Sequence, residues 1–146
     1  MKRFKRHRDF GLFDTDLRIE KLIKLGDPLH RLAKGVDFEY FRPLLEEELS
    51  KEPHGLGGRP GYDYVLLFKV LILQRYFNLS DDQVEFQICD RISFMRFLGL
   101  TIADDIPDSK TIWNFREKIV DLDLSKSLFD FFCQQVGVFR LNLKRG

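Results

Sequence analysis

The stretch "YDYVLLFKVLILQRYFN", residues 62–78, decides the fold. It is apolar on nearly every side, and this length and pattern predict a central, well-buried helix. Its longest apolar run, "VLLFKVLIL" (65–73), is interrupted by Lys69 and is too short to span a bilayer. We therefore expect this helix to lie at the centre of a packed domain.

The segment that follows, "LSDDQVEFQICDRISFMRFLGL" (79–100), predicts one long amphipathic helix over 79–98. Ser80 and Gln83 have the spacing of a capping box, which marks a helix start. A row of apolar residues, which Phe86 is expected to widen, continues to Gly99, where the helix is expected to end.

Two more helices are expected towards the C-terminus. In "IPDSKTIWNFREKI" (106–119), Asp108 or Ser109 caps a helix over 109–121 that turns its apolar residues inward. Those residues are Ile112, Trp113, Phe115, Ile119 and Leu122. The last helix, "LSKSLFDFFCQQVG" (124–137), should stop at Gly137. Strand alternation is nowhere sustained, so the predicted fold is all-α, a small multi-helix bundle.

The N-terminal third predicts short helices and loops. Residues 1–18 form an expected flexible basic arm, and 19–50 contain short helices. Asp27 and Pro28 begin one that runs to about Ala33 and stops at Gly35. Asp37 caps the next, which Pro43 bends or restarts. Residues 51–61 are a Gly/Pro-rich hinge loop, 62–137 the helical core, and 138–146 a basic tail.

Composition and charge limit the possible partners. The chain has 146 residues, 44% of them hydrophobic, and fifteen phenylalanines, which indicates one sizeable core. The net charge is +1, but residues 9–139 hold 16 Lys and Arg against 23 Asp and Glu. A polyanion is therefore favoured by the two ends and opposed by the average body, so any nucleic-acid surface in the body must be a local patch.

The sequence does not favour a metal or catalytic site. Cys89 and Cys133 lie far apart without zinc-ligand spacing, and we expect two buried free thiols in a reducing cytoplasm. Asp104, Asp105 and Asp108 are dense enough to suggest Mg²⁺, but aspartate is ordinary in turns and caps. The basic N-terminus is soon interrupted by acids, unlike a signal peptide. We expect a soluble, cytoplasmic protein.

The order helix 79–98, turn, helix 109–121 resembles a helix-turn-helix unit, although the connection is longer than usual. On the outward face of the second helix, Thr111 and Asn114 are short hydrogen-bonding side chains suited to base edges. Three cations, Lys110, Arg116 and Lys118, can neutralise phosphates. The alternative is a solvated face on which these cations pair with Asp108, Glu117 and Asp121. Spacing alone leaves both interpretations open.

Two further basic segments are candidates for backbone contact. The arm "KRFKRHR" supplies Lys2, Arg3, Lys5 and Arg6 around an aromatic residue, a composition typical of nucleic-acid contacts, and equally of a solubilising terminus. "GGRPG" (57–61) lacks the Lys-Ser/Thr pair of a P-loop and indicates a hinge, in which Arg59 can still touch a phosphate.

Three segments together, "GRPGYDYVLLFKVLILQ", "DRISFMRFLGL" and "IPDSKTIWNFRE", resemble the N-terminal region of IS5-type insertion-sequence transposases, and the similarity covers most of the chain. The resemblance implies a helical region that binds the terminal inverted repeats of the element. In such proteins an RNase-H-like domain follows, which uses Asp, Asp and Glu with two Mg²⁺ ions. The matching positions here are Asp108, Ser109, Lys110, Thr111, Asn114, Phe115 and Arg116.

The chain departs from this pattern at its C-terminus. The family continues into a strand that bears the first catalytic Asp, whereas "FFCQQVGVFRLNLKRG" contains no such strand. We therefore expect a truncated copy that binds double-stranded DNA, is not an enzyme as it stands, and needs no cofactor. It could also associate with itself or with intact transposase. The alternatives are a protein–protein oligomerisation module and a fragment without function.

Overall fold

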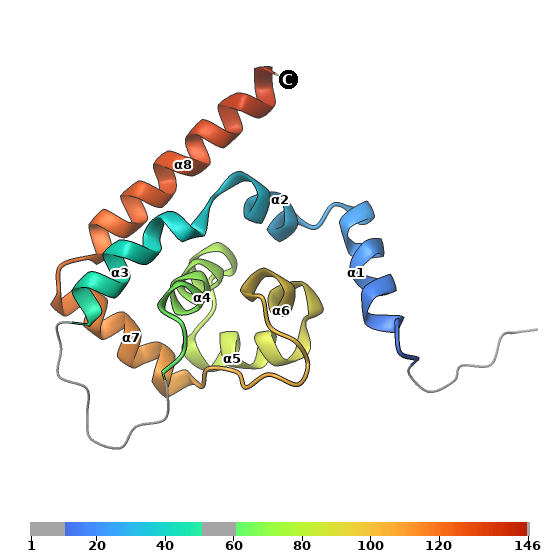
Figure 1. Ribbon diagram of the computed structural model, residues 1–146, viewed down its shortest axis with the longest axis horizontal. Helices are drawn as coiled ribbons and strands as arrows, with labels where there is room; N and C mark the ends of the chain where they lie inside the picture. Colours follow the sequence, from blue (N-terminus) through green and yellow to red (C-terminus); the bar gives the residue numbers. More distant parts are fainter. Residues whose placement is uncertain (1–10, 51–60, 146) are drawn as a thin grey trace, which may run out of the picture.

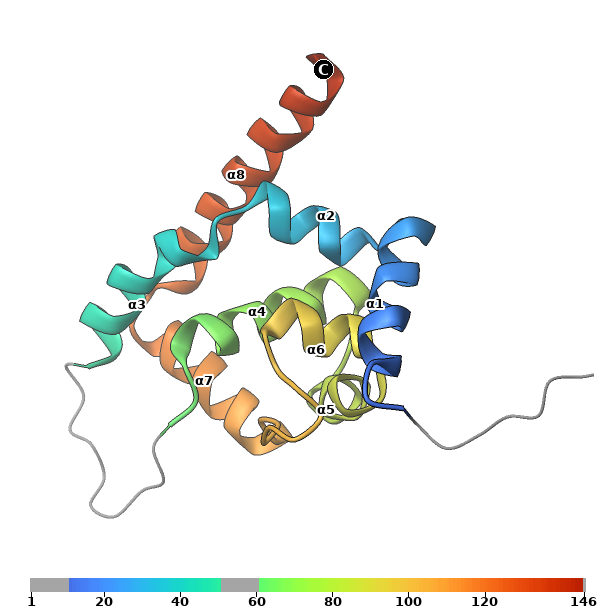
Figure 2. The ribbon, with the colours of Figure 1, turned by 45° about the vertical axis from the view of Figure 1, so that its right-hand side comes forward.

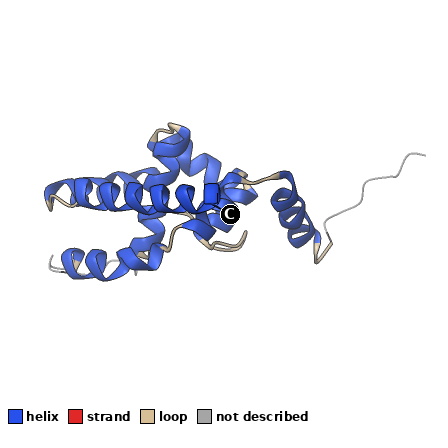
Figure 3. Cartoon of the chain, turned by 90° about the horizontal axis from the view of Figure 1, so that it is seen from above, coloured by secondary structure: helices blue, strands red, loops and turns tan. Residues whose placement is uncertain are grey.

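The computed structural model describes residues 11–50 and 61–145, and within them every regular element is a helix (Figures 1 and 3). The all-α prediction is confirmed. The elements are α1 (Asp14–Leu25), α2 (Pro28–Gly35), a 3₁₀ helix η1 (Phe38–Phe41), α3 (Arg42–Leu49), α4 (Tyr64–Phe77), α5 (Asp81–Asp90), α6 (Ile92–Leu98), α7 (Ser109–Asp121) and α8 (Ser125–Arg145).

Helix α4 is the centre of the bundle, as its sequence predicts. It packs against η1 and against α3, α5, α6 and α7, and in Figure 1 these elements surround it. Phe68, Val70 and Leu73 have no exposed surface. The ring of Phe68 lies 4.7 Å from that of Phe41 and 5.7 Å from that of Phe129, measured between centroids. The many phenylalanines thus fill one core that joins α4 to its neighbours.

Both ends of α4 are fixed by local chemistry. The Asp63 carboxylate accepts a hydrogen bond from the backbone N–H of Val65, which caps the first turn. Asn78, with φ of 53°, ends the helix in the left-handed conformation. Ser80 and Gln83 then form the predicted capping box at the start of α5, with donor–acceptor distances of 3.2 and 2.9 Å.

The single helix expected over 79–98 is instead two helices, so this prediction is wrong. Arg91 has φ of −102° and ψ of 118°, which breaks the helix between α5 and α6. The break lets both halves turn apolar residues into the core, Val84 and Ile88 from α5 and Phe94 from α6. Phe86 does not join them, because 65% of its surface is exposed.

The N-terminal part contains the short helices that the sequence predicts, with one correction. Asp27 caps α2 by accepting from the backbone N–H of Leu29 at 3.0 Å, and Asp37 caps η1 in the same way. Pro43 lies at the start of α3, where the chain passes from 3₁₀ to α geometry. However, α1 begins at Asp14, so the last residues of the expected arm are helical.

The C-terminal prediction also needs correction. Helix α8 runs through Gly137 to Arg145, so the helix does not end at 137, and residues 138–145 of the expected tail are helical. Glycine inside a helix costs only about 1 kcal/mol relative to alanine, so it does not by itself end one. Figures 1 and 2 show the far half of α8 projecting beyond the bundle.

Two smaller findings complete the fold. Cys89 and Cys133 are unpaired thiols, as expected, but both are exposed, which corrects their predicted burial. Across residues 11–50 and 61–145, no helix combines the length and the apolar character that crossing a membrane requires.

Candidate nucleic-acid interface on α7

The start of α7 is held rigidly. Asp108 accepts a hydrogen bond from the backbone N–H of Thr111 at 2.7 Å, as the predicted cap requires. Hydrogen bonds from the side chain and the backbone of Thr111 keep the pKa of the Asp108 carboxyl below its ordinary value. The backbone N–H of Ser109, the first residue of α7, donates to the Glu85 carboxylate of α5 at 3.2 Å. The first turn of α7 is therefore fixed to α5.

The inward face of α7 is an apolar stripe. Ile112, Phe115 and Ile119 are each at most 4% exposed. The ring of Phe115 stacks on that of Tyr64 from α4, with centroids 6.4 Å apart. The predicted core role of these three residues is confirmed, and the stripe determines which side chains face outward.

The outward face presents Lys110, Asn114 and Lys118, all of which are exposed, with Thr111 half-buried beside them. Trp113 was expected to lie inward, but half of its surface is exposed. It follows the buried Ile112 by one residue, which turns the helix by about 100°, so its side chain lies off the buried face. An exposed tryptophan thus lies beside Asn114, the candidate base-reading residue.

Arg116 has internal partners on α5 and α4. Its guanidinium donates to both carboxylate oxygens of Asp81, at 2.8 and 2.7 Å, and to the Gln74 side chain at 3.1 Å. Gln74 in turn donates to Asp81 at 2.7 Å. This network joins α7 to α5 and α4. The sequence did not indicate it, because 35 residues separate Arg116 from Asp81.

The ion pair shifts the pKa of both groups. Hydrogen bonding from Arg116 holds the pKa of Asp81 below its ordinary value, and the same contact raises the pKa of Arg116. Side-chain exposure is 36% for Arg116 and 22% for Asp81, so the pair is partly shielded from water. The guanidinium thus holds α7 in place, and its contact with DNA stays a prediction.

Acidic residues lie in the turn that precedes α7. Asp104 and Asp105, in the turn before α7, are exposed. The Asp104 carboxylate is used within that turn, where it accepts from the backbone and side chain of Thr101 at 2.7 and 3.0 Å. Within residues 11–50 and 61–145, no three His, Cys, Asp or Glu side chains are grouped to hold a metal ion.

The remaining sequence-based candidates are not tested by this geometry. Lys2, Arg3, Lys5, Arg6 and Arg59 lie outside the described residues. The helix-turn-helix-like pair also stays a prediction, since the chain between α6 and α7, residues 99–108, is longer than the few-residue turn of such units.

Comparison with known proteins gives one family. No solved structure matches this chain. A family model described as a transposase domain, DUF772, matches residues 17–118, a span that runs from α1 through nearly all of α7 and covers more than half of the chain. The protein therefore belongs to the DUF772 transposase-domain family.

Proposed function

We propose that this chain is the DNA-binding region of an IS5-type transposase, and that it recognises the terminal inverted repeats of its element. The observation that carries the proposal is the outward face of α7, a rigidly anchored helix in a transposase-family domain that exposes Lys110 and Asn114 near its N-terminal end. Asparagine and threonine read base edges in the major groove, and lysine contacts phosphates.

Within this proposal the residues of α7 have different roles. Asn114 and Thr111 read bases, Lys110 and Lys118 contact the backbone, and Arg116 positions the helix through Asp81. A role on the DNA of a bacterial element would place the protein in the cytoplasm. The expected partner is double-stranded DNA.

The test is fluorescence anisotropy with a terminal-repeat duplex and a scrambled duplex of equal length. Asn114→Ala should reduce the preference for the terminal repeat, because a bidentate base contact contributes about 1–3 kcal/mol of discrimination. Lys110→Gln should weaken binding to both duplexes alike. Lys126→Gln, on the exposed surface of α8, is the matched control. It should change neither the affinity nor the preference for the terminal repeat. Equal affinity of the wild type for the two duplexes would contradict terminal-repeat recognition.

We further propose that this chain binds DNA without cutting it and needs no metal to bind. Two-metal cleavage requires carboxylates fixed on a rigid scaffold around paired ions. The described residues supply helices in which the acids serve as caps and ion-pair partners, such as Asp108 and Asp81. Mg²⁺-dependent nicking of a terminal-repeat duplex by the purified chain would contradict this.

A second candidate function is self-association or pairing with intact transposase. Helix α8 leaves Phe131 and Val138 41% and 58% exposed, and its far half extends beyond the bundle (Figure 2). Gel filtration with and without DNA distinguishes the two functions. A dimer that forms equally well without DNA, and that Val138→Ser disrupts, would favour the oligomerisation module.

A further inference from the structure

The cations of this chain are unevenly distributed. Residues 18–36 and 91–103 hold seven Lys and Arg against two Asp and Glu. Residues 11–17, 37–50, 61–90 and 104–138 hold seven Lys and Arg against nineteen Asp and Glu. The two basic ranges form most of α1, all of α2 and all of α6, and both α1 and α2 pack against α6. The excess of cations therefore lies on three helices of which α6 contacts the other two.

Within residues 11–17, 37–50, 61–90 and 104–138, four of the seven Lys and Arg side chains form the following contacts inside the fold. Arg42 and Arg116 form ion pairs with Asp63 and Asp81. The Arg75 guanidinium lies 3.6 Å from the ring centroid of Phe129. The Lys69 ammonium donates to the backbone carbonyl of Phe97 at 3.1 Å. These groups stabilise the bundle, and their positive charges already have partners within it.

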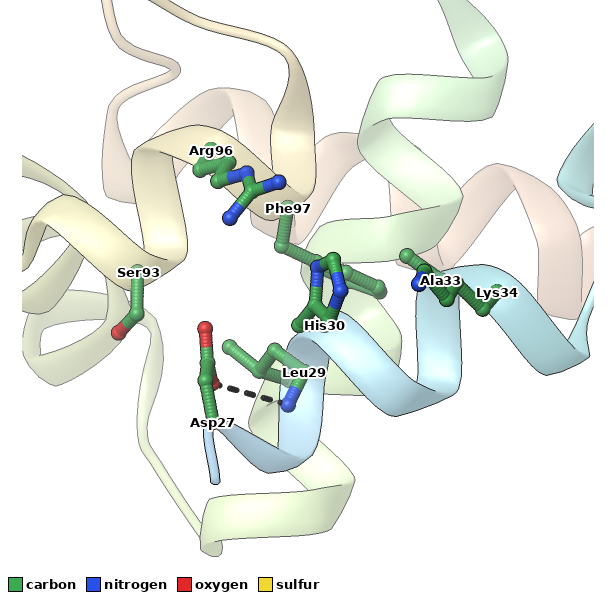
Figure 4. Close-up of a pocket in the computed structure, with 8 residues that line it drawn as sticks. All are labelled: Asp27, Leu29, His30, Ala33, Lys34, Ser93, Arg96 and Phe97. Atoms are coloured by element: carbon green, nitrogen blue, oxygen red, sulfur yellow. Dashed lines mark hydrogen bonds between the residues drawn. The ribbon is translucent and has the colours of Figure 1, made fainter. Parts of the chain in front are cut away.

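A pocket of about 210 Å³ lies between α2 and α6, within the basic region (Figure 4). Arg96 from α6 and His30 from α2 point towards the same space, and Lys34 lines the pocket one turn further along α2. The apolar wall is formed by Leu29 and Phe97, which are both buried. Among the described residues, Arg96 and Lys34 form no ion pair with a carboxylate.

One acid faces the same pocket. Asp27 lies at its edge, where the carboxylate accepts the hydrogen bond from Leu29 that caps α2 (Figure 4). The two positive charges of Lys34 and Arg96 outweigh this single negative charge. The lining thus favours an anion, and Asp27 is the group that opposes it.

We propose that this pocket holds a phosphate group of the DNA backbone, and that the helices around it form a second contact surface for the duplex, separate from α7. The inference rests on the proposed DNA-binding function. Arg96 supplies a planar set of donors that suits phosphate oxygens, Lys34 supplies a point charge, and His30 supplies a ring N–H. Contacts of this kind set affinity and orientation without reading sequence.

The experiment measures anisotropy on a duplex of unrelated sequence at several salt concentrations. Three variants are compared with the wild type: the double variant Arg96→Gln/Lys34→Gln, the single variant Asp27→Asn, and the control Lys126→Gln. One lost phosphate contact lowers the slope of log affinity against log salt by about 0.9, which is about an eightfold loss at roughly 0.1 M salt. The double variant should show this loss. Asp27→Asn keeps a good helix cap and removes the opposing charge, so binding should tighten about two- to threefold.

The outcomes separate this proposal from the function on which it rests. If the wild type binds duplex and Lys110→Gln weakens it, while the double variant keeps the wild-type slope, the pocket is not a phosphate site and the DNA-binding function stands. If the wild type binds no duplex even at low salt, both the phosphate site and the DNA-binding function are contradicted. Inorganic phosphate that raises the Tm of the wild type but not of the double variant, yet displaces duplex no better than chloride of equal ionic strength, would assign the pocket to a free anion and overturn the DNA assignment. Thermal melts by circular dichroism, unchanged from the wild type, establish that the variants are folded.

Discussion

The network of Arg116, Asp81 and Gln74 allows the two possible roles of Arg116 to be separated. Asp81→Asn removes the charge of the partner and keeps the size of its side chain, and Arg116→Gln removes the guanidinium. If Arg116 holds α7 in place, both substitutions should destabilise the fold by similar amounts. If it contacts a phosphate directly, Arg116→Gln should weaken DNA binding, whereas Asp81→Asn should not.

The expected cost in stability follows from the geometry. Two charge-assisted hydrogen bonds of 2.7 and 2.8 Å would be strong in a buried site, but 36% of the Arg116 side chain is exposed and solvent screens the pair. We expect a loss of about 1–2 kcal/mol in the free energy of unfolding for each variant, which lowers Tm by roughly 2–8 °C in a domain of this size. The variant with both substitutions should lose less free energy of unfolding than the two single variants added together, because both changes remove the same ion pair.

The effect should depend on pH in a defined direction. Hydrogen bonding from Arg116 depresses the pKa of Asp81 in the folded state, so the unfolded chain takes up the proton first as pH falls. The contribution of the pair is complete above the unfolded pKa of about 3.9 and is lost as pH falls towards the folded pKa. In urea denaturation, the free energy of unfolding of the wild type should therefore exceed that of Asp81→Asn at pH 7. This difference should shrink below about pH 4.

DNA binding then decides between the two roles. We expect Arg116→Gln to leave the salt slope unchanged within error, and to affect affinity no more than Asp81→Asn does. A slope lowered by about 0.9 in Arg116→Gln alone would show that the guanidinium contacts a phosphate, and would refute the positioning role.

Three other predictions concern the fold and α7. Phe68→Ala empties the centre of the aromatic core and should lower the free energy of unfolding by about 3–5 kcal/mol in urea denaturation. Asp63→Ala removes both the cap of α4 and the partner of Arg42, and should cost about 1–2 kcal/mol; Asp63→Asn keeps the cap and should cost under about 1 kcal/mol. Trp113 is the only tryptophan and is half exposed, so iodide should quench its fluorescence, and terminal-repeat duplex should reduce that quenching.

What could be predicted from the sequence was mainly local. The caps at Asp27, Ser80 and Asp108 follow from short-range chemistry, because donor and acceptor lie two or three residues apart, and all three are present. The buried character of α4 follows from its composition alone. Such features need no knowledge of which helix packs against which.

What could not be predicted depends on tertiary contacts. The break at Arg91 has no glycine or proline to mark it, and its guanidinium lies over the rings of Phe94 and Phe77, at 4.5 and 5.2 Å from their centroids. In the same way, the pairing of Arg116 with Asp81 depends on how α5 and α7 pack. The convergence of His30 and Arg96 on one pocket depends on how α2 and α6 pack.

The charges around α7 bear on how this domain would attract DNA. Two lysines of this face, Lys110 and Lys118, are close in the sequence to five acids, so long-range attraction of a polyanion to it is expected to be weak. The acids are Asp104, Asp105, Asp108, Glu117 and Asp121. Base-reading side chains act only after the duplex has arrived, and the attraction must come from another surface. Residues 18–36 and 91–103 have the required excess of cations. Substitution of the base-reading residues Thr111 and Asn114 on α7 should therefore change which duplex is preferred, whereas Arg96→Gln/Lys34→Gln should weaken binding to every duplex by the same factor.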